Sequence, residues 1–182
     1  MRDPMSHPED HAVALLERYE SFNWRAALCA SVVAALVFAT LDIGLGWALH
    51  GISPWVPLRM MGAIVLGPAA LSPPDTFDGQ IVLVAICLHI VLSIVYGTFL
   101  ALVMPTVGSA LAILLGGLYG LALYYINFYG FNAFSPWFLD QRDWLSIVAH
   151  CAFGAALAYA YVTINTRGMN HTAEESTQSL LL

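Results

Sequence analysis

The chain has 182 residues, of which 59% are hydrophobic and only 10% are charged, and its formal net charge is -6. This composition is far more apolar than that of a soluble domain of the same length. The chain has no lysine, and its six arginines form no basic cluster, which excludes a nucleic-acid-binding protein. The composition therefore predicts an all-α, polytopic membrane protein made of a single helix bundle.

Residues 1–24 are predicted to form a polar and amphipathic N-terminal segment. Ala12, Leu15, Leu16, Tyr19 and Phe22 recur at helical spacing, with charged residues on the opposite side. This pattern predicts an amphipathic helix that lies on the membrane surface. A simple continuation into the following helix explains the pattern equally well.

Four apolar runs are long enough to cross a hydrocarbon core of about 30 Å at about 1.5 Å per residue. We expect them at residues 25–49, 80–104, 109–131 and 144–164. They define a transmembrane domain over residues 25–164, and residues 165–182 are predicted to be a disordered polar tail. The short turn at residues 105–108 predicts that the second and third spans are antiparallel neighbours.

Residues 60–71, between the first and second spans, are apolar but too short to cross a membrane. A Ser-Pro-Trp turn precedes them at residues 53–55, and prolines interrupt and follow them. We expect an interfacial or re-entrant half-helix on the outer side, with a partly formed extra span as the alternative.

The arginines predict the orientation of the four spans. An even number of spans places both termini on the same side, and more arginines flank that side than the other. Because arginine is enriched on the cytoplasmic side of membranes, we expect both termini to be cytoplasmic. The arginines on the terminal side are Arg2, Arg18, Arg25 and Arg167, and those on the outer side are Arg59 and Arg142.

Small and polar residues share one face of each span, because residues three, four and seven apart lie on the same side of a helix. Glycines on such a face let two helix backbones approach closely, so we expect Gly97, Gly116, Gly120 and Gly154 to lie at helix contacts. The four faces are Ser31, Ala35, Ala39, Asp42 and Gly46; Ala85, His89, Ser93, Tyr96 and Gly97; Ala112, Gly116, Gly120, Tyr124 and Asn127; and Asp143, Ser146, His150, Gly154, Ala158 and Tyr161.

Four polar residues on these faces, Asp42, His89, Asn127 and His150, are predicted to lie at similar depth in the outer half of the bundle. Three interpretations stay open: an interhelical hydrogen-bond network, a site for an ion, a proton or a small solute, and a metal or haem site. Arg59 is a candidate counter-charge for Asp42 or for a bound anion. Its alternative position is among the lipid headgroups.

The sequence offers little for a cofactor or for catalysis. His89 and His150 are the only candidate metal ligands, because the neighbouring Cys87 and Cys151 point to other sides of their helices. We expect no cofactor, with haem or a transition metal as the alternative. No phosphate-binding loop, nucleophile elbow or zinc-protease motif occurs, so we expect no catalytic residue and no enzyme.

Several strings together resemble a family of small four-helix bacterial membrane proteins that often carries the label sodium:proline symporter. The resemblance covers about residues 24–164 and implies a bacterial inner-membrane protein, with transport as an implied activity. The strings are Arg59-Met60, residues 89–97, Asn127-Phe128-Tyr129-Gly130-Phe131, Ser135-Pro136-Trp137-Phe138, and Ala149-His150 with Phe153-Gly154.

Two functions are compatible with these features. In the first, the protein is a non-catalytic accessory or structural subunit of a larger bacterial membrane complex, such as a respiratory or other redox assembly. In the second, it is a small homo-oligomeric transporter or channel that uses Asp42, His89 and His150. The expected partners are the lipid bilayer and either other membrane subunits or further copies of the chain.

Overall fold

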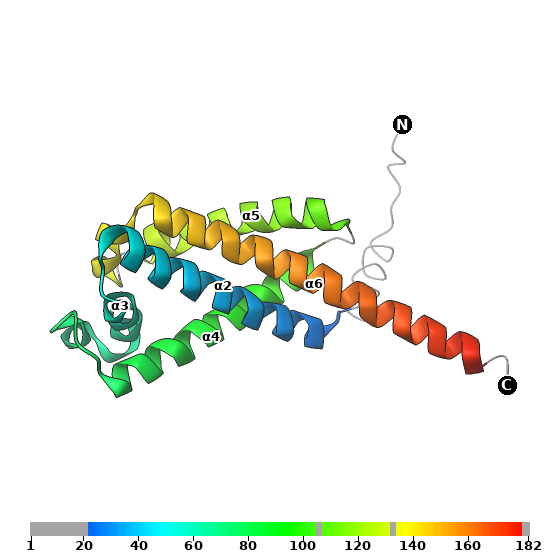
Figure 1. Ribbon diagram of the computed structural model, residues 1–182, viewed down its shortest axis with the longest axis horizontal. Coiled ribbons are helices and arrows are strands. Elements are labelled where there is room, and N and C mark those ends of the chain that lie inside the picture. Colours follow the sequence, from blue (N-terminus) through cyan, green and yellow to red (C-terminus); the bar gives the residue numbers. More distant parts are fainter. Residues whose placement is uncertain (1–21, 105–106, 132–133, 180–182) are drawn as a thin grey trace, which may run out of the picture.

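The computed structural model describes residues 22–104, 107–131 and 134–179, with side chains up to residue 166 except at position 140. All its regular elements over these residues are helices (Figure 1). They are α2 (Trp24–His50), α3 (Trp55–Leu66), the 3-10 helix η1 (Pro68–Leu71), α4 (Gly79–Val103), α5 (Ser109–Tyr125), the π-helical turn η2 (Ile126–Gly130), the 3-10 helix η3 (Pro136–Gln141) and α6 (Trp144–Ser179).

Four helical stretches are long and apolar enough to cross a membrane, which confirms the number of predicted spans. They are Trp24–His50, Gly79–Val103, Ser109–Gly130 and Trp144–Thr166. Between the first two lies the short apolar helix α3, where the sequence predicted a half-helix. The predicted amphipathic helix of residues 11–24 lies almost entirely outside the described residues.

Local sequence sets where the helices begin and end. The side chains of Asn23, Asp78 and Asp143 accept hydrogen bonds from backbone N–H groups in the first turns of α2, α4 and α6, at 2.9 to 3.2 Å. Such caps satisfy donors that have no partner inside the helix. At the other end of α2, Gly51 has φ of +66°, a left-handed conformation that glycine adopts at little cost.

The closest helix contact joins α5 to α6 at three glycines. A Cβ atom on Gly116 or Gly154 would collide with the backbone carbonyl of the other, and one on Gly120 would collide with the carbonyl of His150. A fourth glycine, Gly97, brings α4 against Ser31 of α2. Backbones can approach this closely only where the side chain is absent, so these four glycines determine which helices pair.

The pairing of helices corrects one prediction. The extensive helix contacts are those of α5 with α6, α2 with α6, α2 with α4 and α3 with α4. In contrast, α4 and α5 are consecutive but touch through long side chains, as in the hydrogen bond from the Tyr119 hydroxyl to the Tyr96 carbonyl at 2.8 Å. The prediction that they pack as neighbours was wrong, because the glycine-rich face of α5 packs on α6.

The C-terminal segment also differs from expectation. The sequence predicted a disordered tail from Asn165, whereas α6 continues as a helix to Ser179 and extends beyond the other helices (Figure 1). The segment contains no proline, and its alanine, glutamate and glutamine residues have high helix propensity. The fourth span was predicted to end at residue 164, close to the end of the apolar stretch Trp144–Thr166, but polarity did not indicate the end of the helix.

The residues on the exposed lateral surface of the bundle are largely apolar, as contact with lipid requires. Every member of the four predicted polar faces is buried or half-buried. Large side chains on the other faces are exposed, among them Leu36, Leu83, Val91, Phe99 and Leu118. Polar groups therefore face protein and apolar groups face outward, as in a membrane bundle.

The glycine contact between α5 and α6 gives a stability prediction. We expect Gly120→Ala to destabilise the protein by roughly 1–3 kcal/mol, because the new methyl group must displace the backbone of α6. The measurement is thermal or denaturant unfolding in dodecylmaltoside.

The matched control is Gly117→Ala, three residues earlier on α5, whose added Cβ would approach no atom closer than 4.0 Å. Equal stability of the two variants would contradict the close approach of α5 and α6.

Candidate functional site

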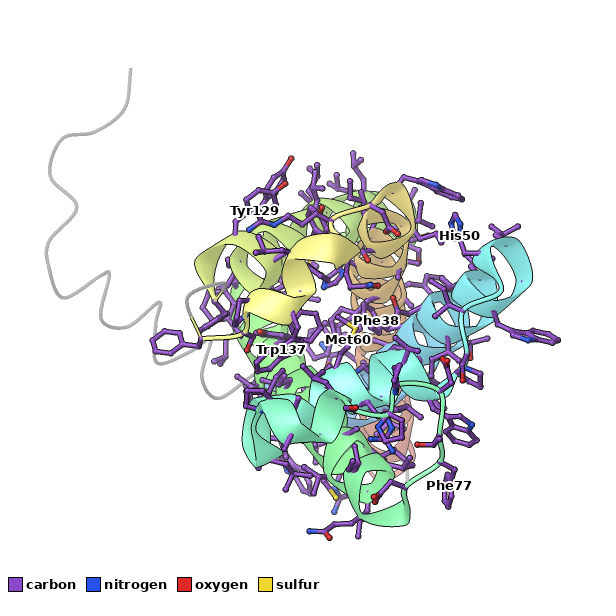
Figure 2. All side chains as sticks on the ribbon, turned by 90° about the vertical axis from the view of Figure 1, so that its left-hand side faces the viewer. Phe38, His50, Met60, Phe77, Tyr129 and Trp137 are labelled. Carbon is purple, nitrogen blue, oxygen red and sulfur yellow. The ribbon has the colours of Figure 1, made fainter. Side chains whose placement is uncertain are left out.

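A cavity of about 450 Å³ lies at the end of the bundle that carries α3 and η3. Its walls come from α2, α4, α6 and the end of α5, where α4 and α5 do not pack together. Figure 2 looks onto this end of the molecule: Phe38 and Met60 lie near the centre, and Tyr129 and Phe77 lie toward the rim. The Trp137 indole donates a hydrogen bond to the Met60 carbonyl at 3.0 Å, which ties η3 to α3 across this end.

All four residues of the predicted polar cluster line this cavity: Asp42, His89, Asn127 and His150. They come from α2, α4, η2 and α6, so residues far apart in sequence contribute to one site. Ser93, Tyr96 and Ser146 add hydroxyl groups to the same lining.

Hydrogen bonds connect three of the elements around the cavity. The Tyr96 hydroxyl donates to Asn127 Oδ1 at 2.7 Å, and Asn127 Nδ2 lies 3.4 Å from His150 Nε2. His150 Nδ1 lies 2.7 Å from the Ser146 carbonyl, which can only accept, so the proton is on Nδ1. Nε2 is then free to accept the hydrogen bond from Asn127, and the ring is neutral. This network links α4, η2 and α6.

The π-helical turn positions Asn127 in this network. Its widened geometry leaves the Phe128 carbonyl free to accept two hydrogen bonds from Arg142, from Nε at 3.0 Å and from Nη2 at 2.7 Å. The Arg142 guanidinium also lies 3.9 Å from the centre of the Tyr129 ring. Arg142 therefore fixes the end of α5 to the start of α6.

Phe38 packs against both histidines of the cluster. Its ring centre is 5.4 Å from that of His89 and 4.9 Å from that of His150. His89 Nε2 donates to the Ala35 carbonyl at 3.0 Å, and no described residue forms a hydrogen bond with its Nδ1. Both imidazoles line the cavity and pack against the same aromatic ring.

Asp42 lies where this cavity meets a second, much smaller one of about 20 Å³. Asp143 also lines the small cavity, and its side chain caps the first turn of α6. Among the described residues, no arginine lines either cavity. The carboxylates therefore make this part of the site electronegative.

The structure assigns Arg59 a different role from either prediction. Arg59 is 5% exposed, so it does not reach the lipid headgroups, and it does not line the cavity of Asp42. Its guanidinium donates to the Thr76 carbonyl, the Ala70 carbonyl and the Thr76 hydroxyl at 2.7 to 2.8 Å. The proline-rich segment after α3 has backbone carbonyls without partners inside a helix. The planar guanidinium of Arg59 donates hydrogen bonds to two of these carbonyls.

The arrangement of donors bears on the metal and haem alternative. Among the described residues, no group of three or more histidine, cysteine, aspartate or glutamate side chains converges as metal ligands do. One nitrogen of each histidine ring is already hydrogen-bonded to a backbone carbonyl, of Ala35 and of Ser146.

Two features of the site were not identified from the sequence. Phe38 belongs to no polar pattern, and only the pairing of α2 with both α4 and α6 brings it into contact with both histidines. The π-helical turn had a weak signal, because Asn127 interrupts an apolar run shortly before Gly130. Tyr96 was recognised on the polar face of α4, but not as the partner of Asn127.

Comparisons with family models, with curated proteins and with solved structures find no match to this chain. The interpretation of the site therefore depends on its chemistry.

The hydrogen-bond network gives a second stability prediction. We expect Tyr96→Phe to lower the free energy of unfolding by roughly 0.5–1.5 kcal/mol, because Asn127 loses the donor to its carbonyl oxygen. Thermal unfolding in detergent measures the effect.

Tyr125→Phe is the control, since this ring is 53% exposed and lies outside the network. A loss of stability no larger than that of the control would contradict a role for Tyr96 in holding the site together.

Proposed function

We propose that the protein binds a small solute in its cavity and transports it, with Asp42, His89, Asn127 and His150 as the polar part of the site. The supporting observation is the cavity itself. Its volume of about 450 Å³ lies within the usual range for ligand-binding sites, and four helical elements contribute one polar residue each. An interhelical network that only fixes packing needs no such space, because a close-packed interior is more stable.

The proposed site has the location that transport requires. Ionisable residues in membrane spans are costly and commonly mark a solute or ion pathway. In the proposed orientation, with cytoplasmic termini in a bacterial inner membrane, the cavity faces the outer side beneath α3 and η3. The implied transport activity of the family that the sequence resembles agrees with this proposal.

Assembly is part of the proposal. A bundle of four spans encloses the cavity from one side of the membrane only, so a complete pathway calls for a second copy of the chain. The exposed apolar faces of α4 and α5 offer surfaces for such self-association.

Access from water tests this function. In a background with Cys29, Cys87 and Cys151 replaced by alanine, we expect Ser93→Cys to react with a membrane-impermeant, water-soluble methanethiosulfonate in liposomes. Ser93 lines the cavity, although it is only 3% exposed. Mass spectrometry of the intact protein measures the modification.

Ser31→Cys is the matched control, because Ser31 is fully buried between α2 and α4, away from the cavity. Labelling of Ser93→Cys no faster than that of the control would contradict a solute site open to water.

A second candidate function is an accessory subunit of a larger membrane complex, such as a redox assembly. The observation that favours it is the exposure of α4, of whose most apolar stretch only 22% is buried within the chain. Such a face fits a neighbouring subunit as well as it fits lipid.

The accessory role predicts that unrelated membrane subunits co-purify in mild detergent at a fixed ratio. A Val91→Trp change on the exposed face of α4 would then disrupt that assembly. Purification of the chain alone, or only with further copies of itself, would contradict the accessory role.

A further inference from the structure

The donors and acceptors around the cavity are unevenly used. Three side-chain N–H donors, on His89, His150 and Asn127, and the Tyr96 hydroxyl already have acceptors within the protein. What remains is the carboxylate of Asp42, which accepts no hydrogen bond from the described residues. The site therefore offers one negative charge that no described residue of the lining balances.

This balance selects against one class of ligand. An anion would be repelled by Asp42 and would meet no arginine in the lining. Serine hydroxyls and the Gln141 amide in the lining can donate or accept, so they do not favour either sign of charge.

The remaining wall of the cavity is apolar and aromatic. Phe38, Phe128, Phe138 and Phe153 line it, and so do Met60 and Met61 of α3. Aromatic faces attract cations, and methionine side chains adapt to ligands of different shape. A ligand that combines a positive charge with an apolar body would satisfy both parts of the site.

We propose that the ligand of this cavity is an organic cation, a protonated amine on an apolar body, whose ammonium group is bound by Asp42. This inference rests on the proposed function, because it names the class of solute that the site would take. The ammonium group supplies hydrogen-bond donors to the Asp42 carboxylate, and its charge balances that of the carboxylate. The apolar body of the ligand makes van der Waals contacts with the side chains of the cavity wall, which otherwise have no contact on that side.

Three probes that share one body separate charge from shape: 1-naphthylmethylamine, 1-naphthalenemethanol and 1-naphthoate. Calorimetric titration of the full chain in nanodiscs should show the amine binding about tenfold or more tightly than the alcohol, and the carboxylate binding most weakly. In Asp42→Asn, the affinity for the amine should fall to that for the alcohol, while the affinity for the alcohol stays unchanged.

Two controls accompany these titrations. Asp78→Asn removes a carboxylate from the same end of the molecule, where Asp78 caps α4 and does not line the cavity, so the preference for the amine should persist. Leu92→Trp fills the cavity from α4 and should abolish binding of all three probes beyond their partition into lipid.

The outcomes distinguish this inference from the proposed function. Binding that Leu92→Trp blocks, but that shows no preference for the amine or keeps that preference in Asp42→Asn, would overturn the organic cation and leave solute binding intact. Binding of none of the three probes beyond the level of Leu92→Trp would overturn both.

Discussion

The close approach of α5 and α6 at Gly116, Gly120 and Gly154 is the constraint on which the rest of the structure depends. These glycines let the two backbones touch, and this contact fixes α5 to α6. A second contact, of Gly97 with Ser31, fixes α4 to α2. Consecutive helices α4 and α5 are thereby held on different partners, and the space between them becomes the cavity. In a membrane, where lipid is as apolar as leucine, such steric fit has to supply the specificity of helix pairing.

The site is built on rigid elements that these contacts position. Asp42 and His89 lie on regular helices, Asn127 lies on a π-helical turn held by Arg142, and His150 follows the capped start of α6. The hydrogen bonds of His150 with Ser146 and Asn127 fix its tautomer, and Phe38 packs against its ring. Polar groups in a membrane are costly unless paired, so the Asp42 carboxylate, which accepts no hydrogen bond from the described residues, is the group that a ligand would satisfy.

Much of this arrangement could be predicted from the sequence. Apolar runs and their breaks located the four spans, because bilayer thickness sets their length. Helical spacing grouped Asp42, His89, Asn127 and His150 on inward faces, and all four line one cavity. Spacing could not show that α4 and α5 diverge, because partner choice depends on which glycines meet across helices. It also could not place Arg59, whose partners are backbone carbonyls of a proline-rich segment. The length of α6 was missed because polarity marks the membrane boundary and not the helix end.

The convergence of the two histidines on Phe38 is the most direct test of this account. Solid-state NMR on the protein in lipid bilayers, with ¹³C in phenylalanine rings and ¹⁵N in histidine rings, measures it through dipolar contacts. The ring centre of Phe38 lies 5.4 Å from that of His89 and 4.9 Å from that of His150, and that of Phe128 lies 5.5 Å from that of His150, so in Phe38→Leu the His89 contact should disappear and the His150 contact should weaken to that with Phe128. A change at only one imidazole, or at neither, would mean that α2, α4 and α6 do not enclose a common site.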